Sequence, residues 1–227
     1  ASKRMLAALG LWDGLAEHAQ PMNEIKVSDG RVNDAQVFLG LHFDSAEIEE
    51  GPMGYMLEDW FLRRALMDAL DAEPRITHMS GETVIAQDVD ARRVEVSLAS
   101  GGTVSGRLLI GADGRQSGTC ARAKIRRTGW SYGQTALVCA IAHDKPHGGI
   151  AHQLFLPPGP LAILPLTGNR SSIVWSETDA QARALNALPE EQYLEVLRPR
   201  FGDFLGEISI AGDRFTYPLN LTLANSF

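Results

Sequence analysis

Apolar residues recur at helical spacing in three stretches of the chain and alternate with polar residues in several others. The first helical stretch follows Ser2, a suitable amino-terminal cap, and stops at Gly10; the others cover residues 60–70 and 184–201, where Gly202 ends the pattern. Strand-like runs are found at residues 24–28, 37–43, 83–87, 94–98, 136–141, 152–156, 161–166, 171–175 and 215–219. This order predicts an α/β fold of mixed α+β character, with an antiparallel sheet and one covering helix in the second half.

One short stretch combines a buried-strand pattern with a turn. Residues 108–110 are a continuous apolar run, typical of a strand that is buried on both faces of a sheet. Gly111 and Gly114 then allow the backbone to turn sharply and to approach a ligand closely. Asp113 lies between them, where its carboxylate can accept a hydrogen bond from a ribose hydroxyl or hold a water against a pyrophosphate. The alternative is a plain Asp-Gly turn without a ligand.

Composition and charge exclude several classes of protein. The 227 residues are 44% hydrophobic and 22% charged, as in an ordinary globular protein. A net charge of −7 and a pI near 5.4 argue against a nucleic-acid-binding surface. No apolar run approaches the roughly 18 residues of a membrane-spanning helix, and no secretory signal is recognised. Cys120 and Cys139 are too few for a disulfide framework, so we expect free thiols and a reducing, cytoplasmic compartment.

Two groups of potential metal ligands are better explained without a metal. The carboxylates of residues 44–50 do not have the spacing of a calcium loop and are expected in a solvated loop. His143, His147 and His152 lie close together in the sequence, but no cysteine or carboxylate stands at a supporting interval. We therefore predict no metal site.

The stretch around Asp113 also resembles a known motif. Residues 109–117 read Leu-Ile-Gly-Ala-Asp-Gly-Arg-Gln-Ser, with Arg122 following, and resemble the second flavin motif of the para-hydroxybenzoate hydroxylase family of FAD-dependent monooxygenases. Residues 2–12, 54–59 and 129–134 resemble the branch of that family that hydroxylates ubiquinone precursors in bacteria. The resemblance covers nearly the whole chain.

The resemblance implies two discontinuous domains. Residues 1–20 and 55–128 correspond to an incomplete Rossmann-like FAD domain, and residues 21–54 and 129–227 to an antiparallel-sheet substrate domain stacked over the flavin. The family's first motif, Gly-x-Gly-x-x-Gly, and its last, Gly-Asp-Ala-Ala-His, are not found in the sequence. We therefore expect an internal fragment of the family fold, without bound FAD and without catalytic activity of its own.

The same resemblance assigns candidate cofactor contacts and leaves the catalytic residues unknown. The expected FAD-binding residues are Asp59, Arg63, Gly111, Asp113 and Gly114. Family members often carry a polar or basic residue after the position of Asp59, where this chain has Trp60. Arginines at the start of such a helix are otherwise simply solvated, so the identity of the arginine that contacts FAD stays open.

The reaction implied by the resemblance is hydroxylation of a polyprenylated phenol precursor of ubiquinone, with NADH or NADPH as reductant and dioxygen as oxidant. FAD would carry the chemistry, while the protein excludes water and positions the ring. A prenylated substrate further implies contact with the inner membrane or with a ubiquinone-biosynthesis complex. Two alternatives stay open: a flavin oxidoreductase of the same fold with other chemistry, and a non-catalytic module that binds a hydrophobic ligand or a partner.

The large aromatic residues of the second half have two interpretations. Trp175, Phe155 and Tyr217 are predicted in the hydrophobic core, because large aromatic side chains in strand-like runs are usually buried. The alternative is that one of them lines a prenyl or quinone pocket.

Overall fold

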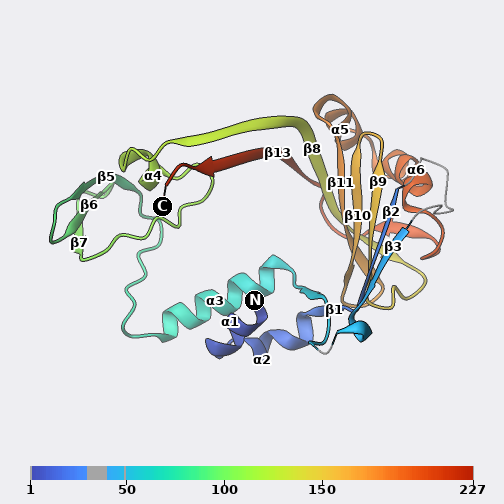
Figure 1. Cartoon of the computed structure of the whole chain (residues 1–227), viewed down its shortest axis with the longest axis horizontal. Helices are drawn as coiled ribbons and strands as arrows, with labels where there is room; N and C mark the ends of the chain where they lie inside the picture. Colours follow the sequence, from blue (N-terminus) through green and yellow to red (C-terminus); the bar gives the residue numbers. More distant parts are fainter. Residues whose placement is uncertain (1, 30–39, 49, 227) are drawn as a thin grey trace. The chain divides into compact units, whose positions relative to one another are not determined.

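The computed structural model describes residues 2–29, 40–48 and 50–226 (Figure 1). Contacts divide the chain into two compact units, one of Ala1–Ala72 with Gly133–Leu219 and the other of Glu73–Tyr132 with Asn220–Phe227. This division groups residues 1–20 and 55–72 with the large sheet, whereas the resemblance places them in the FAD domain. The domain boundaries implied by the resemblance therefore stay a prediction.

The first unit is built on a sheet that has eight strands within the described residues. These are β2 (Glu24–Asp29), β3 (Gly40–Asp44), β8 (Arg127–His143), β9 (Ile150–Leu156), β10 (Gly159–Leu166), β11 (Arg170–Thr178), β12 (Ile208–Ile210) and β13 (Phe215–Ala224). Their order is β12-β8-β11-β10-β9-β2-β3, with β13 also paired to β8. The predicted antiparallel arrangement is confirmed with one exception, since β2 runs parallel to β9. The first three residues of the strand expected at 37–43 lie outside the described residues.

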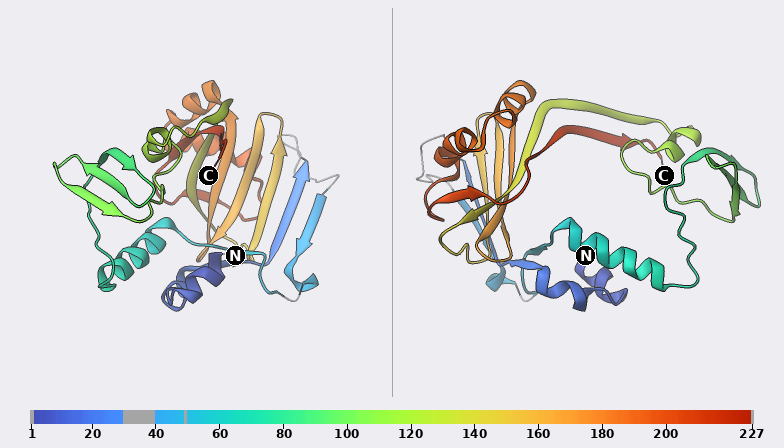
Figure 2. Two further views of the ribbon diagram at one scale, coloured as in Figure 1. Left: turned by 60° about the vertical axis from the view of Figure 1, so that its left-hand side comes forward. Right: turned by 180° about the vertical axis from the view of Figure 1, so that it is seen from behind.

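Two helices cover one face of this sheet, where a single helix over 184–201 was expected (Figure 2). They are α5 (Asp179–Asn186) and α6 (Glu190–Phe201). Pro189 explains the break, because proline has no N–H to donate and disfavours helical geometry in the residue before it. Gly202 ends α6 as predicted, with a left-handed φ of 85°.

The core of the first unit lies between these helices and the sheet. It includes Leu137, Leu161, Ile173 and Trp175 from the strands, together with Leu197 from α6. Strand alternation accounts for the pattern, since every second residue of a strand faces the helices. The burial of Trp175 confirms one prediction about the aromatic residues.

Two other aromatic predictions were wrong. Phe155 is 51% exposed, because its neighbours in β9, Leu154 and Leu156, face the helices and turn Phe155 to the opposite face. Tyr217 is 49% exposed in β13, a strand that joins the sheet only through β8. Aromatic content alone therefore did not indicate which face of a strand is covered.

A buried carboxylate lies beneath the helices. Glu177 is almost fully buried, and the indole N–H of Trp175 donates a hydrogen bond of 3.0 Å to its Oε1. The Arg200 guanidinium is more distant, with its Nε 3.9 Å from the same oxygen. Burial raises the pKa of Glu177 above its usual value, although Trp175 and Arg200 both oppose that shift.

We expect Glu177→Gln to change the unfolding free energy at pH 7 by no more than about 1 kcal/mol, because the amide oxygen still accepts from Trp175 and the relief of a buried carboxylate offsets the loss of the distant Arg200 contact. The pKa of Glu177 is higher in the folded protein than in the unfolded chain. The unfolding free energy of the protein therefore falls as the pH rises from the unfolded-state pKa through the folded-state pKa, and the variant should lack this fall. Urea denaturation at pH 4 and pH 7 measures both effects. The exposed Glu195→Gln is the control; a clear loss of stability in Glu177→Gln at pH 7 contradicts the interpretation.

The remaining elements of the first unit are short apart from one helix. They are α1 (Ser2–Ala8), α2 (Trp12–Leu15), η1 (Ala16–His18), β1 (Gln20–Met22), η2 (Ser45–Glu47), β4 (Gly54–Met56) and α3 (Asp59–Ala72). Both the predicted stop at Gly10, with φ of 73°, and the predicted helix over 60–70 are confirmed. None of the fourteen described residues of α3 is buried, although Phe61, Leu62 and Ala65 are less exposed than the charged side.

The second unit has a three-stranded antiparallel meander, which confirms the strands predicted at residues 83–87 and 94–98. Its strands are β5 (Val84–Val89), β6 (Val94–Leu98) and β7 (Thr103–Gly106), and its helix is α4 (Gly118–Arg122). The predicted buried strand at 108–110 is wrong: Leu108 and Ile110 are each 76% exposed. An apolar run becomes a buried strand only when neighbouring strands pair with it, and no strand among the described residues does so.

Candidate functional site

The Asp113 carboxylate organises the start of α4. Ser117 Oγ donates to Asp113 Oδ1 at 2.5 Å, and the Thr119 N–H donates to Oδ2 at 3.0 Å. Ser117 Oγ in turn accepts from the Cys120 N–H at 2.9 Å. These hydrogen bonds satisfy helix N–H groups that have no partner inside the helix. They also hold the pKa of Asp113 far below its usual range, mainly through Ser117.

The two glycines of this turn serve different purposes. A Cβ on Gly111 would lie 3.0 Å from Thr119 Cγ2, so Gly111 permits close packing of the turn on α4. Gly114 has a left-handed φ of 81° and open space around it, so its backbone conformation is what requires glycine. The turn therefore depends on glycine at both positions.

A hollow of about 850 Å³ lies beside this turn within the second unit. Gly111, Gly114 and Thr119 contribute to its lining, together with the exposed side chains of Leu108 and Ile110. Five arginines also line it, together with Asp90: Arg92, Arg93, Arg107, Arg115 and Arg127. The hollow thus combines glycine backbone that a ligand can approach closely, exposed apolar side chains and the positive charge of arginines.

Asp59 and Arg63 form a pair of their own at the start of α3. Arg63 Nη2 lies 3.3 Å from Asp59 Oδ2, and both side chains are largely exposed. The structure thus groups Gly111, Asp113 and Gly114 in the second unit and pairs Asp59 with Arg63 in the first. The assignment of all five to FAD stays a prediction.

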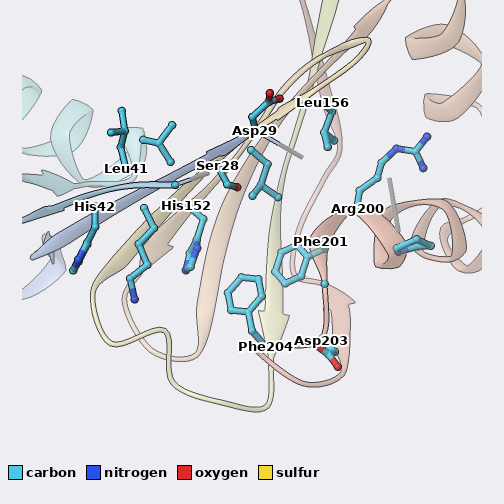
Figure 3. A pocket seen from close by; sticks show the side chains of 16 residues that line it. Ser28, Asp29, Leu41, His42, His152, Leu156, Arg200, Phe201, Asp203 and Phe204 are labelled. Atoms are coloured by element: carbon cyan, nitrogen blue, oxygen red, sulfur yellow. The ribbon is translucent and has the colours of Figure 1, made fainter. Parts of the chain in front are cut away.

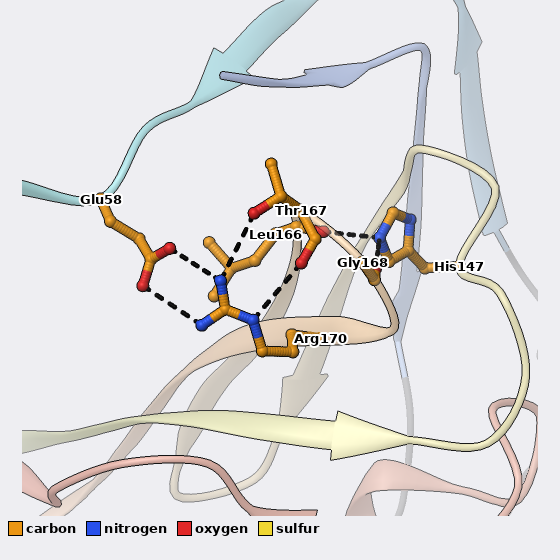
Figure 4. A network of polar contacts seen from close by, with 6 residues as sticks. All are labelled: Glu58, His147, Leu166, Thr167, Gly168 and Arg170. Atoms are coloured by element: carbon orange, nitrogen blue, oxygen red, sulfur yellow. Dashed lines mark hydrogen bonds and ion pairs between the residues drawn. The ribbon is translucent and has the colours of Figure 1, made fainter. Parts of the chain in front are cut away.

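The sequence reasoning missed an ion pair just before α3. Arg170 at the start of β11 donates to both carboxylate oxygens of Glu58, with Nη2 2.8 Å from Oε2 and Nη1 3.3 Å from Oε1 (Figure 4). The same guanidinium contacts Thr167, at its carbonyl and hydroxyl oxygens. Each side chain of the pair is about one-third exposed. The pair fixes the segment leading into α3 against the large sheet.

His147 supports the turn that carries Thr167. Its Nε2 lies 2.8 Å from the Leu166 carbonyl oxygen and 2.9 Å from that of Gly168 (Figure 4). Because Nδ1 accepts from the Gly149 N–H, Nε2 carries the proton and donates to these carbonyls. This histidine is therefore occupied in holding a loop.

The other two histidines also have structural contacts. His143 is buried, with Nε2 3.0 Å from Ser171 Oγ, and the ring of His152 lies 4.5 Å from that of Phe204. Among the described residues, no group of three or more histidine, cysteine or acidic side chains is arranged to hold a metal ion. Cys120 and Cys139 are free, as predicted.

The face of the large sheet away from α5 and α6 carries exposed apolar side chains. Leu41 and Phe43 of β3 are 63% and 47% exposed, and strand alternation places Phe155 on the same face. Their neighbours on that face include Val27 of β2 and Ala162 of β10. An exposed apolar face of this kind is typical of a ligand or interaction surface.

Comparison with curated proteins identifies close relatives. The chain is 42% identical over 227 residues to ubiquinone hydroxylase UbiL of Rhodospirillum rubrum, a match that covers the whole chain and 52% of that protein. It is 31% identical over 210 residues to 3-demethoxyubiquinol 3-hydroxylase of Escherichia coli, covering 92% of the chain and 52% of that protein. The chain thus spans about half the length of these relatives.

Solved structures and family models agree with this result. The fold is similar to p-nitrophenol 4-monooxygenase PnpA of Pseudomonas putida, with a TM-score of 0.74 at 14% identity over 98% of this chain and 57% of that one. It is also similar to PqsL of Pseudomonas aeruginosa, with a TM-score of 0.72 at 20% identity over 92% and 55% of the two chains. The predicted mixed α/β class is confirmed. Residues 2–213 match the model of the FAD binding domain, and the chain therefore belongs to this family of FAD-binding proteins.

Proposed function

We propose that the chain supplies part of an FAD-dependent aromatic-ring monooxygenase that hydroxylates a polyprenylated phenol precursor of ubiquinone with NADH or NADPH and dioxygen. The observation that carries this proposal is the 42% identity to a ubiquinone hydroxylase along all 227 residues. A match of that level over the whole chain supports a shared reaction more strongly than a shared fold, which hosts several chemistries.

The hollow beside Asp113 has the chemistry that FAD requires. Its arginines Arg107, Arg115 and Arg127 suit an anionic pyrophosphate, and its exposed apolar side chains suit a flavin or adenine ring. Open backbone at Gly114 allows close approach of a ligand. Both Asp113 oxygens already accept one hydrogen bond, but a carboxylate oxygen can accept a second, for example from a ribose hydroxyl.

The exposed apolar face of the large sheet is the proposed substrate surface. When bound, FAD supplies the redox chemistry by which one oxygen atom of dioxygen reaches the ring. The protein's own residues then have to bind the ring and prenyl chain, and to exclude water. Leu41, Phe43 and Phe155 offer such an apolar surface, with Asp29 as the charged neighbour of Phe155 on the same face.

A prenylated substrate also has to be delivered to the protein. No helix in the described parts of the chain is both long and apolar enough to cross a bilayer. We propose peripheral contact with a membrane or with a ubiquinone-biosynthesis complex, supported by the exposed apolar side chains of the sheet.

The proposal is tested by titrating FAD into the protein expressed from its complete gene and into the 227-residue chain alone, with calorimetry and the visible spectrum as readouts. We expect the complete product to bind FAD and the chain alone not to bind it. In the complete product, Asp113→Ala should weaken binding by at least tenfold, because the turn and the start of α4 lose their acceptor. Glu73→Ala is the control, since Glu73 also holds a turn of the second unit, through Arg75, but lies outside the hollow. If neither protein binds FAD and a parallel titration shows that the chain binds a prenylated phenol, the hydrophobic-ligand module replaces the monooxygenase.

A further inference from the structure

A second cavity lies in the first unit, on the side of the sheet that α6 covers (Figure 3). It has a volume of about 430 Å³ and lies between β2, β3 and β9 and the carboxyl end of α6. Leu154, Leu156, Phe201 and Phe204 provide its apolar walls. Most of the proposed substrate surface is on the opposite face of the same sheet, although Val27 and Leu41 border both the surface and the cavity.

Strand register brings four polar side chains to one side of the cavity, namely Lys26, Ser28, His42 and His152; His42 is already held by Glu24, 2.8 Å from its Nε2. Lys26 is paired with His152 and Ser28 with Leu154 in the parallel β2–β9 ladder, which places these side chains on one face. Asp29 follows Ser28 and therefore points to the opposite face. Arg200 contributes mainly its aliphatic part, since its guanidinium packs on the Trp175 ring, 5.1 Å from the centroid.

The hydroxyl of Ser28 is the feature of this cavity that indicates a ligand. It is only 6% exposed, yet its hydroxyl forms no hydrogen bond with any of the residues that the structure describes, and Figure 3 shows it directed into the cavity. His152, which is partly buried, is likewise without a hydrogen-bond partner among those residues, and its ring lies 4.5 Å from the Phe204 ring. A polar group on the wall of an apolar cavity that has no protein partner is available to a ligand.

The polar wall of the cavity offers one cation to an anion. Lys26 Nζ lies 3.5 Å from Glu24 Oε2, which leaves ammonium hydrogens for another acceptor. Burial lowers the pKa of His152 to about 4, and the next contribution is repulsion from Lys26, which exceeds the opposing effect of Glu24. Lys26 therefore supplies positive charge at this wall, while the carboxylate of Asp203 lines the cavity near the end of α6. His152 is neutral at pH 7 and able to donate a hydrogen bond.

We propose that this cavity binds a small organic anion, a carboxylate on an apolar body, with the carboxylate at Lys26, Ser28 and His152 and the apolar body between Leu154, Phe201 and Phe204. The apolar body is a ring or a short acyl chain. The site goes beyond the proposed hydroxylase function, because neither FAD nor the phenol is required to bind there.

Calorimetric titration with 2-naphthoate and with octanoate tests the proposal and shows whether the apolar part of the ligand is a ring or an acyl chain. The neutral amides, 2-naphthamide and octanamide, are the matched ligands, and we expect at least one acid to bind fivefold or more tightly than its amide. NMR titration should show the largest amide shifts at Ser28, His152 and Phe204. Equal affinity of acids and amides, no binding, or shifts centred elsewhere overturns the proposal.

Three variants test the polar wall by changes in ligand affinity that do not depend on a loss of folding. Ser28→Ala should fold normally, since the hydroxyl has no partner among the described residues, and should weaken the acid about three- to tenfold. Lys26→Met should abolish the preference for acid over amide. Arg183→Met, an exposed cation of α5 outside the cavity, should leave both affinities unchanged. Unchanged binding in Ser28→Ala and Lys26→Met overturns the assignment of the polar wall.

Discussion

Replacing Trp175 by alanine is expected to lower the unfolding free energy of the first unit by about 3–5 kcal/mol. The side chain is 0% exposed and lies in the core between the sheet and α6. Its ring contacts Tyr193 edge to face at 5.9 Å and carries the Arg200 guanidinium at 5.1 Å. The substitution also removes the indole donor from buried Glu177. Urea denaturation followed by far-UV circular dichroism gives the free energy.

An exposed tryptophan of the same unit provides the comparison. Trp60 is 64% exposed on α3, so Trp60→Ala should change the free energy by about 0.5 kcal/mol or less. Trp175→Phe should fall between the two, because it keeps part of the apolar volume but loses the N–H donor. Similar losses for Trp60→Ala and Trp175→Ala would show that burial of Trp175 does not hold the sheet and α6 together.

Elements whose pattern depends only on neighbouring residues could be predicted from the sequence. The alternation of apolar and polar residues in β9, β10 and β11 reflects strands with one covered face. The 3.6-residue period of apolar residues likewise predicted the helix α3. The turn at Asp113 could also be predicted from the sequence, because both hydrogen-bond donors to its carboxylate lie within six residues of it. Local chemistry of this kind leaves a local signature.

Features that depend on distant parts of the chain could not be predicted. The run at 108–110 is apolar enough for a buried strand, but apolar content does not specify whether another strand pairs with it. Alternation in β9 likewise did not indicate which face α6 covers, and Phe155 was therefore misplaced. The Glu58–Arg170 pair joins residues 112 positions apart, so nothing near either residue indicated it.

Reversing the charge of Arg170 is expected to release the segment before α3. In Arg170→Glu two carboxylates face each other where a bidentate pair stood, at sites only about one-third exposed. We expect a loss of about 1–3 kcal/mol, between the values for exposed and buried pairs. Hydrogen exchange should accelerate at the Phe61 N–H, which donates to the Glu58 carbonyl at 3.1 Å at the start of α3.

The swapped variant decides whether the pair itself holds this segment. Arg170→Glu combined with Glu58→Arg should recover at least half of the lost stability, because an ion pair can form again with its polarity exchanged. Arg64→Glu is the control on α3: its pair with Asp68 is long, at 3.8 Å, and both side chains are mostly exposed, so the cost should be about 0.5 kcal/mol or less. If Arg170→Glu costs no more than Arg64→Glu, the pair does not position α3. If the swap restores stability and Phe61 protection together, the sheet carrying the proposed substrate surface also sets the position of Asp59 and Arg63.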